Sequence, residues 1–349
     1  MNDILALARP DILALQAYSH ASWDPAFERL HANELPWRAE TDRSLAGLNR
    51  YPEPHPHELA ARLAELYDVP PGQLLPGRGS DESIDLLVRG FCRAGVDNVI
   101  ICPPTFGMYA VAARIQGAQV REVPLLREQG FALDTAGVLA ACDANTRIVF
   151  LCSPNNPTGN SVDPAAIETL LNALAGKALV VVDEAYIEFS RANSLAATRD
   201  RLPNLVVLRT LSKAYGLAGA RVGSLIAAAP IVALLAKVIP PYSIPQLTIE
   251  AVFATLTPPQ IRIQRERIVQ VLAERDRIAA ALRASPRVAR VWPSDANFLL
   301  VDFHDAEAAL AATRAEKLLI RDMRNVSPYS LRISVGSPAQ NDRLIRSLA

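Results

Sequence analysis

Short runs of consecutive apolar residues alternate with helix-like patterns through the middle of this 349-residue chain. The run at Leu179–Asp183 is apolar at successive positions, which is expected of a strand that helices cover on both faces of a sheet. The alternation indicates an α/β domain with a mostly parallel sheet. The elements expected there are strands at Val99–Cys102, Arg147–Cys152, Leu179–Asp183, Leu205–Arg209 and Gly223–Ala227, with helices at Asp81–Arg93, Pro164–Leu174 and Pro230–Val238.

The pattern changes after about residue 245, and the length of the chain also favours more than one core. We predict a large domain over residues 45–245 and a smaller α+β domain over residues 246–349, with the N-terminal segment 1–44 packed against the smaller domain. The elements expected in the smaller domain are a long helix at Gln260–Ala284, a strand at Asn297–Phe303, a helix at Ala306–Lys317, strands at Leu318–Arg321 and Leu331–Val335, and a terminal helix.

The charge balance and the apolar runs exclude several classes of protein. Lys plus Arg and Asp plus Glu are equal at 36 each, whereas a nucleic-acid-binding protein usually carries a basic excess. The apolar runs are far shorter than a membrane span, and Asp3, Arg9 and Asp11 interrupt the N-terminal one, so that it does not read as a signal peptide. We therefore expect a soluble, cytoplasmic protein that binds neither nucleic acid nor membrane.

The cysteines and histidines do not form a metal-site pattern. No cysteine belongs to a CxxC pair, so we expect small buried hydrophobes in a reducing compartment; the cysteines are Cys92, Cys102, Cys142 and Cys152. His55 and His57 flank a proline, but the neighbouring sequence offers too few further ligands for a metal. No metal is predicted.

A lysine that follows an apolar strand among small residues and hydroxyls is the central chemical feature of the sequence. Lys213 lies in Thr210–Gly223 (TLSKAYGLAGARVG), and such an amine can form an imine with an aldehyde. Thr210, Ser212 and Arg221 supply the hydroxyls and guanidinium of a phosphate cradle. An imine-forming lysine beside a phosphate cradle is what pyridoxal phosphate requires, although Lys213 alone would also suit a surface loop.

A second motif places a carboxylate at the end of a predicted central strand. Asp183 begins DEAY, and the carboxyl ends of strands in open α/β sheets face the ligand crevice. An aspartate there can keep a pyridinium nitrogen protonated, and Tyr186 can hydrogen-bond the phenolic oxygen of the same ring. A helix cap after the strand is the alternative interpretation of Asp183 taken alone.

Three further segments follow or precede predicted strands and helices. Ser153–Gly159 (SPNNPTG) reads as a rigid turn, in which the amide of Asn156 could reach the ring oxygen. Gly77–Glu82 (GRGSDE) precedes an amphipathic helix and predicts an anion site, but it lacks the third glycine of a dinucleotide fingerprint and the GK[ST] of a P-loop. Phe106 could stack on a flat cofactor or simply pack in the core.

In this order, the motifs resemble the aspartate-aminotransferase fold group of pyridoxal-phosphate enzymes, and within it the histidinol-phosphate aminotransferase family. The similarity extends from about residue 12 to the C-terminus. The resemblance implies a large domain with a seven-stranded type of sheet and a smaller α+β domain built from the N- and C-terminal parts. The segments that carry it are Asn33-Glu34, LNRYP at 48–52, GRGSDESIDLLVR, CPPTFGMY, SPNNPTG, DEAY, TLSKAYGLAGARVG and LRISVG at 331–336.

The resemblance also implies roles for individual residues. Lys213 would carry pyridoxal phosphate as a Schiff base and shuttle the proton, and Asp183 would pair with the pyridine nitrogen. Asn156 and Tyr186 would contact the ring oxygen, and Phe106 would stack on the ring. The cofactor phosphate would be held by Ser80, Asp81, Thr210, Ser212 and Arg221.

The resemblance further implies a homodimer and a substrate. Tyr51 is similar to the tyrosine that reaches the phosphate from the partner subunit, and Arg332 to the arginine that binds the substrate anion. Arg321 and Tyr18 resemble further contacts to that anion. The implied reaction belongs to histidine biosynthesis and converts L-histidinol phosphate and 2-oxoglutarate into imidazole acetol phosphate and L-glutamate.

Three departures from the family pattern keep other activities open. Ala220 stands where relatives carry a larger aliphatic residue, Phe106 stands where a tyrosine is common, and the segment between Met323 and Arg332 is short and lacks the usual glycine. The alternatives are an aromatic amino acid aminotransferase and a threonine-phosphate decarboxylase. A non-catalytic cofactor-binding regulator is a rival of another class, and the chain shows no spare segment for the DNA-binding module expected of one.

Overall fold

The described residues, 4–24 and 26–348 of a computed structural model, contain a seven-stranded sheet in the order β1-β7-β6-β5-β4-β2-β3. Strand β7 runs antiparallel to both of its neighbours and the other pairs are parallel, which confirms the mostly parallel sheet. The strands are β1 (Leu74–Gly77), β2 (Asn98–Ile101), β3 (Gln119–Glu122), β4 (Thr146–Cys152), β5 (Leu179–Asp183), β6 (Leu205–Thr210) and β7 (Gly223–Ala227).

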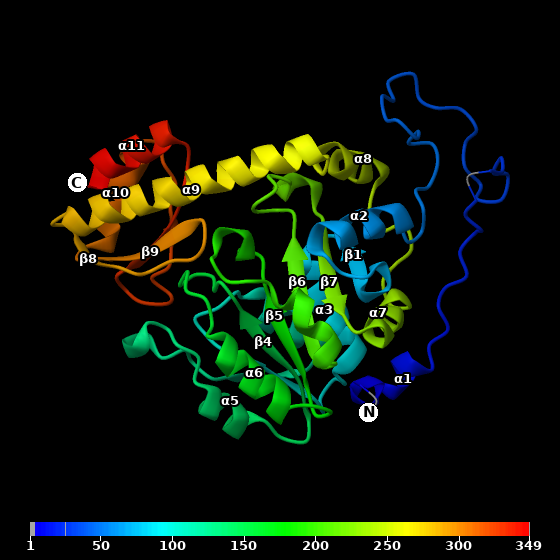
Figure 1. Cartoon of the computed structure of the whole chain (residues 1–349), viewed down its shortest axis with the longest axis horizontal. Coiled ribbons are helices and arrows are strands. Elements are labelled where there is room, and N and C mark those ends of the chain that lie inside the picture. Colours follow the sequence, from blue (N-terminus) through cyan, green and yellow to red (C-terminus); the bar gives the residue numbers. More distant parts are fainter. Residues whose placement is uncertain (1–3, 25, 349) are drawn as a thin grey trace.

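Helices cover both faces of this sheet, so each central strand must be apolar at successive positions (Figure 1). Strand β5 shows the consequence, because Val180 and Val182 enter one hydrophobic cluster whereas Leu179 and Val181 enter the other. The helices of this part of the chain are α2 (His57–Tyr67), α3 (Ser80–Phe91), α4 (Met108–Gln116), α5 (Thr135–Ala141), α6 (Pro164–Ala173), α7 (Ala229–Ala236) and α8 (Gln246–Thr255). Short 3-10 turns lie at η2 (Pro71–Gln73), η3 (Arg127–Gln129), η4 (Ile187–Phe189), η5 (Leu195–Arg201) and η6 (Ala218–Ala220).

A second, antiparallel sheet in the order β10-β11-β9-β8 forms the smaller domain. It has its own hydrophobic cluster, which includes Ile278, Val301 and Phe303. Strand β10 comes a few residues later than predicted, because the antiparallel pairing with β11 begins at Arg321. The elements are α9 (Pro258–Ala284), β8 (Val288–Val291), β9 (Phe298–Phe303), α10 (Ala306–Ala315), β10 (Arg321–Asp322), β11 (Ser330–Ser334) and α11 (Pro338–Leu348).

The long helix α9 links the two parts of the molecule along its top edge (Figure 1). The helix before it, α8, buries Ile249 and Val252 in a cluster of the large sheet, and Leu256, the residue after the helix, belongs to the same cluster. Packing therefore assigns α8 to the large domain, whereas the boundary predicted from the sequence lies in front of it, between residues 245 and 246.

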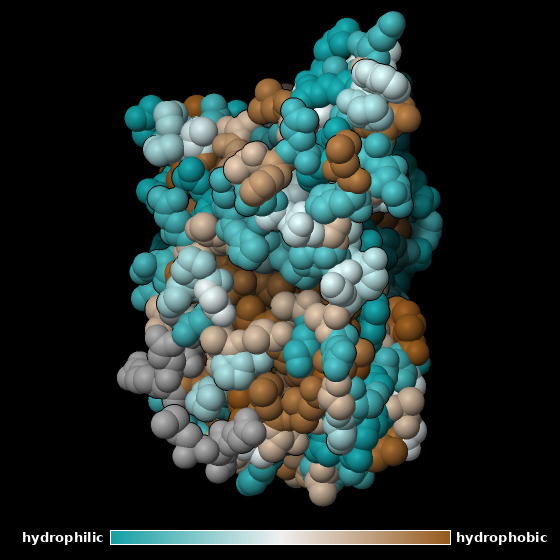
Figure 2. Space-filling view, turned by 90° about the vertical axis from the view of Figure 1, so that its right-hand side faces the viewer, coloured by the Kyte–Doolittle hydropathy of each residue, from teal (hydrophilic) through white to brown (hydrophobic). Residues whose placement is uncertain are grey.

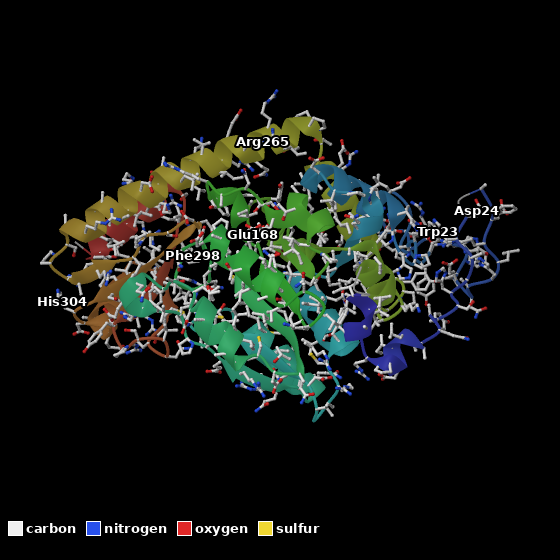
Figure 3. The ribbon with its side chains drawn as sticks, turned by 60° about the horizontal axis from the view of Figure 1, so that its bottom comes forward. Trp23, Asp24, Glu168, Arg265, Phe298 and His304 are labelled. Atoms are coloured by element: carbon white, nitrogen blue, oxygen red, sulfur yellow. The ribbon has the colours of Figure 1, made fainter. Side chains whose placement is uncertain are left out.

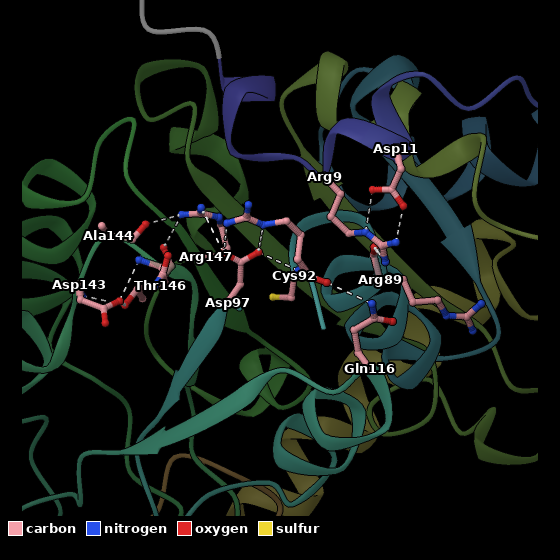
Figure 4. Close-up of polar contacts among 12 residues, drawn as sticks. Arg9, Asp11, Arg89, Cys92, Asp97, Gln116, Asp143, Ala144, Thr146 and Arg147 are labelled. Atoms are coloured by element: carbon pink, nitrogen blue, oxygen red, sulfur yellow. Dashed lines mark hydrogen bonds and ion pairs between the residues drawn. The ribbon is translucent and has the colours of Figure 1, made fainter. Parts of the chain in front are cut away.

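The first described residues pack on the large domain, which corrects the prediction that this end of the chain packs with the smaller one. Ile4, Leu7 and Ala8, from η1 (Ile4–Leu7) and the residue after it, share a hydrophobic cluster with α3 and α7. The backbone N–H of the next residue, Arg9, donates to the carbonyl of Gly90 at 3.0 Å. Its guanidinium also donates to the Arg89 carbonyl at 3.0 Å (Figure 4). The apolar side chains at this end therefore pack against α3, and the arginine that follows them hydrogen-bonds to the last turn of that helix.

Beyond α1 (Pro10–Leu13), the chain runs to α2 without a further helix or strand among the described residues (Figure 1). Trp23 and Asp24 in this segment lie at the opposite end of the molecule from His304 of the smaller domain (Figure 3). Large apolar side chains along it remain exposed, among them Leu30, Trp37 and Leu45 at 94%, 74% and 82%. Hydrophobic patches also appear on the face seen in Figure 2. Monomeric proteins seldom leave so many large apolar groups uncovered along one segment.

The cysteines are free thiols of the large domain. Burial of Cys92, Cys102 and Cys152 agrees with the expectation of small buried hydrophobes, whereas Cys142 is only partly buried. Desolvation raises the pKa of Cys92 and of Cys102 to about 12, so both thiols stay protonated at neutral pH. Among the described residues, no helix is both long enough and apolar enough to cross a membrane.

Candidate active site

A cavity of about 680 Å³ lies at the carboxyl ends of β4, β5 and β6 and is closed on one side by the β10–β11 hairpin of the smaller domain. This is the edge of the sheet at which open α/β domains bind their ligands. The cavity brings together most of the predicted site residues, namely Ser80, Asp81, Phe106, Asn156, Asp183, Tyr186, Thr210, Ser212, Lys213, Arg221, Arg321 and Arg332.

Asp183 is the last residue of β5 and is 2% exposed. Its Oδ1 accepts the backbone N–H of Ala185 at 3.1 Å, and its Oδ2 accepts the hydroxyl of Tyr109 at 2.8 Å. Burial raises the pKa of Asp183 to about 6, and the two hydrogen bonds oppose that rise. The carboxylate is therefore ionised at neutral pH and suits a cationic partner in the cavity.

Lys213 follows β6 and lines the same cavity. Its Nζ lies 5.7 Å from the centre of the Tyr186 ring. Partial burial lowers the pKa of Lys213, and the positive charges of Arg332 and Arg221 lower it further. A lowered pKa leaves more of the amine neutral, and the neutral amine is the form that attacks a carbonyl or accepts a proton.

A chain of hydrogen bonds joins the two domains across the cavity. Arg332 on β11 donates through Nη1 to Oδ1 of Asn156, which orients the Asn156 amide. The Nδ2 of that amide then faces the Tyr186 hydroxyl at 3.4 Å. The buried Nε of Arg332 has no hydrogen-bond partner within the described part of the chain. An anionic ligand would provide the acceptor that this nitrogen lacks.

Another part of the cavity lining carries hydroxyls and a guanidinium beside the start of α3. Arg221 donates through Nη2 to Asp81 at 3.1 Å and through Nη1 to the Ser212 hydroxyl at 3.3 Å. The Thr210 hydroxyl accepts the backbone N–H of Ser212 at 3.1 Å. Ser80 begins α3, where free backbone amides favour an anion. Because the Asp81 carboxylate pairs with Arg221, Asp81 would serve an anion through its backbone N–H.

Two glycines allow the chain to close tightly around this anion site. A Cβ added to Gly223, at the start of β7, would lie 2.5 Å from the backbone nitrogen of Ser80. A Cβ added to Gly79 would lie 2.7 Å from Nη2 of Arg221, and Gly79 has a φ of +87°. The side chains of other residues would push the strand, the helix start and the arginine apart.

Phe106 and Arg321 also line the cavity. Phe106 lies before α4 and meets the Tyr109 ring edge to face, with centroids 5.6 Å apart. Arg321 is the cross-strand partner of Arg332 in the β10–β11 pair, which brings a second guanidinium to the cavity.

Two predicted site residues do not line this cavity. Tyr51 is 51% exposed and packs against Tyr242, with ring centroids 4.8 Å apart. Tyr18 is 72% exposed in the extended N-terminal segment. Within one chain, the structure therefore does not join either tyrosine to Lys213, and their predicted roles would require a second subunit or a different placement of the segment.

Two buried residues that support the site were not among the residues predicted from the sequence. Tyr109 contacts Asp183, and an aromatic residue three positions after Phe106 was the only signal of it. Asn155, in the predicted turn, donates to the Pro104 carbonyl at 2.8 Å and accepts the Thr105 hydroxyl at 2.9 Å. Asn155 therefore ties the loop after β4 to the loop after β2.

Comparisons with known proteins agree with this geometry. Residues 27–348 match the family model for aminotransferase class I and II. Over its full length the chain is 46% identical to histidinol-phosphate aminotransferase of Stenotrophomonas maltophilia, covering 97% of that protein. It is 48% identical to histidinol-phosphate aminotransferase of Xylella fastidiosa, over 91% of this chain and 88% of that protein.

A solved structure shares the fold as well. Histidinol-phosphate aminotransferase from Sinorhizobium meliloti, in complex with pyridoxal-5'-phosphate, superposes with a TM-score of 0.77 at 27% identity, over 86% of this chain and 84% of that chain. A shared fold by itself does not fix a substrate. Taken with the full-length match to the family model and the curated relatives, however, the comparison shows that the chain belongs to the class I and II aminotransferases, among the histidinol-phosphate aminotransferases.

Proposed function

We propose that this chain, with pyridoxal phosphate as its cofactor, transfers the amino group of L-histidinol phosphate to 2-oxoglutarate. The observation that carries the proposal is the meeting of Lys213, Asp183 and Arg332 in one cavity that also holds a candidate anion site. The relatives that are named for that activity match this chain over 97% and 88% of their own length.

The residues present fit pyridoxal phosphate. The free amides at the start of α3, the hydroxyl of Ser212 and the guanidinium of Arg221 would hold its phosphate. The buried Asp183 carboxylate would face the ring nitrogen, and Phe106 would lie against the ring. The Tyr186 hydroxyl accepts from Asn156, which leaves its own O–H available to the ring oxygen.

When bound, pyridoxal phosphate would supply an aldehyde that condenses with amines and a ring that withdraws electrons from the α-carbon of the substrate. Lys213 would bind the aldehyde carbon of the cofactor through Nζ. As a free amine, the same Nζ would take up the α-proton of the substrate, because the lowered pKa of Lys213 keeps part of this amine neutral. Asp183 would stabilise the protonated ring nitrogen throughout.

The cavity must accept two different anions in turn, the phosphate ester of one substrate and the carboxylate of the other. Arg332 suits both, because a guanidinium binds either group through paired hydrogen bonds, and its Nε is unused within the described residues. Arg321, on the neighbouring strand, would add the second positive charge that a phosphate dianion favours.

We further propose that the chain acts as a homodimer with shared active sites. The exposed apolar side chains between α1 and α2, such as Leu30 and Trp37, would be covered by the partner. Tyr51 lies outside the cavity of its own chain, so that it is available to the cavity of the partner. The cytoplasmic location remains a prediction from the sequence.

The test is an assay of the purified protein with pyridoxal phosphate, several donors and several acceptors. We expect glutamate to form from 2-oxoglutarate with L-histidinol phosphate as donor, faster than with phenylalanine or tyrosine. Preference for the aromatic donors would transfer the assignment to an aromatic aminotransferase. Release of carbon dioxide from threonine phosphate without formation of glutamate would instead indicate a decarboxylase.

A further inference from the structure

Tyr109 is a buried residue that the proposed chemistry leaves unused. It is the second residue of α4, is 0% exposed, and does not itself line the cavity. Its hydroxyl lies 2.8 Å from Oδ2 of Asp183. A carboxylate can only accept, so Tyr109 must be the donor whenever Asp183 is ionised.

The Tyr109 ring is fixed by two aromatic neighbours. It stacks on Phe150 of β4, with centroids 4.9 Å apart and planes 3° apart. Its edge meets Phe106, the residue proposed to lie against the cofactor ring. Since Phe150 is also buried, at 1% exposure, the tyrosine has no room to turn its hydroxyl away from Asp183.

We propose that Tyr109 is a positioning residue that keeps the Asp183 carboxylate ionised and oriented toward the ring nitrogen of the bound cofactor. This inference rests on the proposed function, because it concerns how Asp183 meets the cofactor. Among the described residues, the hydroxyl of Tyr109 is the one side-chain donor to Asp183. The other carboxylate oxygen of Asp183 accepts the backbone N–H of Ala185.

The effect of the Tyr109 hydrogen bond on the pKa of Asp183 is consistent with this role. Burial raises the pKa of Asp183 to about 6, and the Tyr109 hydrogen bond is the strongest of the effects that hold the value down. A hydrogen bond to the charged form favours that form, and its loss raises the pKa of the carboxyl further. Without the Tyr109 hydrogen bond, Asp183 would therefore become protonated at a higher pH than in the wild type.

The experiment measures the affinity for pyridoxamine phosphate as a function of pH in the wild type and in Tyr109→Phe. This ligand lacks the aldehyde, so its binding does not depend on a bond to Lys213. In the wild type, the affinity should decrease as the pH is lowered, with a midpoint near pH 6, because Asp183 becomes protonated there. In Tyr109→Phe, the midpoint should rise by about one pH unit, the tenfold change in proton affinity expected when a carboxylate loses one such bond.

Other titrating groups remain the same in this comparison. Besides Tyr109, those that act electrostatically on Asp183 are Asp81, Cys152, Tyr186 and Lys213. The ligand phosphate also titrates in this range, but equally in both proteins.

Tyr67→Phe is the matched control. Tyr67 is a buried tyrosine at the end of α2 that does not line the cavity, so removal of its hydroxyl should leave the midpoint at the wild-type value. A second arm avoids any loss of packing. Incorporation of 3-fluorotyrosine at position 109 makes the hydroxyl a stronger donor and should move the midpoint to lower pH.

The outcomes separate this inference from the proposed function. A wild-type protein that does not bind pyridoxamine phosphate overturns the proposed function, and the role of Tyr109 with it. Binding with the same midpoint in the wild type and in Tyr109→Phe overturns only the role of Tyr109. An equal shift in Tyr67→Phe would also overturn it, because the effect would then belong to any buried hydroxyl. A Tyr109→Phe protein that does not fold leaves the fluorotyrosine arm to decide, and an unmoved midpoint there rejects the proposal.

Discussion

At the scale of single residues, the site depends on one amine whose surroundings change its chemistry. Lys213 lines the cavity. Burial lowers the pKa of its amine, and the positive charge of Arg332 lowers it further. Asp183 faces the same cavity with its pKa raised toward neutrality. Two groups whose surroundings displace their pKa values in opposite directions are typical of an acid–base site.

Replacement of Lys213 by alanine should separate binding from turnover. The phosphate cradle at Arg221 and Ser212 is untouched, so Lys213→Ala should still bind pyridoxal phosphate. Turnover should fall by about 10²–10⁴-fold or more, the range for removal of a general acid–base group. Steady-state transamination and the absorbance of the bound cofactor measure the two effects.

The control for this variant is a lysine of the same chain that lies outside the cavity. Lys237 follows α7 and does not line the cavity, so Lys237→Ala should retain wild-type turnover. Near-normal transamination by Lys213→Ala would show that another group carries the reaction.

At the scale of secondary-structure elements, the anion site depends on how closely β7 approaches the start of α3. Gly223 permits that approach, because a Cβ there would lie 2.5 Å from the backbone of Gly79 and Ser80. The helix start, the strand and Arg221 are therefore positioned as a unit.

Gly223→Ala should loosen this unit. We expect a loss of about 1–3 kcal/mol in the free energy of unfolding, the usual cost of overpacking, together with weaker binding of pyridoxal phosphate. Thermal unfolding and cofactor titration measure these two quantities. Gly219→Ala is the matched control, since a Cβ there meets nothing within 4 Å. Equal effects of the two substitutions would contradict the argument from close approach.

The β10–β11 pair offers a second prediction at this scale, because it sets Arg321 beside Arg332. Arg332→Ala should damage both half-reactions, whereas Arg321→Ala should weaken the reaction of histidinol phosphate more than that of glutamate. The expected difference is about 1–3 kcal/mol for one charge-assisted hydrogen bond. The measurement is kcat/KM of each half-reaction in each variant.

Arg324→Ala provides the control for that series. Arg324 lies in the same turn but pairs with Asp322 and Glu307 and does not line the cavity. Its replacement should change neither half-reaction. Equal losses for both substrates in Arg321→Ala would remove the phosphate-reading role from that residue.

At the scale of the whole molecule, the chain between α1 and α2 exposes apolar side chains and holds Tyr51 away from its own cavity. Mixed dimers of Tyr51→Ala and Lys213→Ala chains test whether the partner completes the site. Each mixed dimer would contain one intact site and one doubly damaged site. Random mixing should therefore recover about a quarter of wild-type activity, because half of the dimers are mixed.

A mixture of Asp183→Ala and Lys213→Ala chains is the control, because both residues line the cavity of one chain. No intact site can form in that mixture, so its activity should remain at the level of the parents. Absence of recovery in confirmed Tyr51 and Lys213 mixed dimers would show that Tyr51 does not complete the site of its partner.

The sequence by itself determined the central strands of the large sheet and the residues at their carboxyl ends. A strand buried on both faces, such as β5, must be apolar at successive positions, and this requirement is visible locally. The edge strands were not predicted, because β1 contains a proline and a glycine and β3 is partly exposed. Neither carries the local signature of a buried strand.

Only the tertiary structure decided which distant groups meet. Tyr109 and Asp183 are 74 residues apart, and Asn156 and Arg332 are 176 residues apart. Packing also assigned α8 and the first described residues to the large domain, against the predicted organisation. The physical reason is that local patterns record whether a segment is buried, whereas the identity of its partners depends on how the sheets and helices close around it.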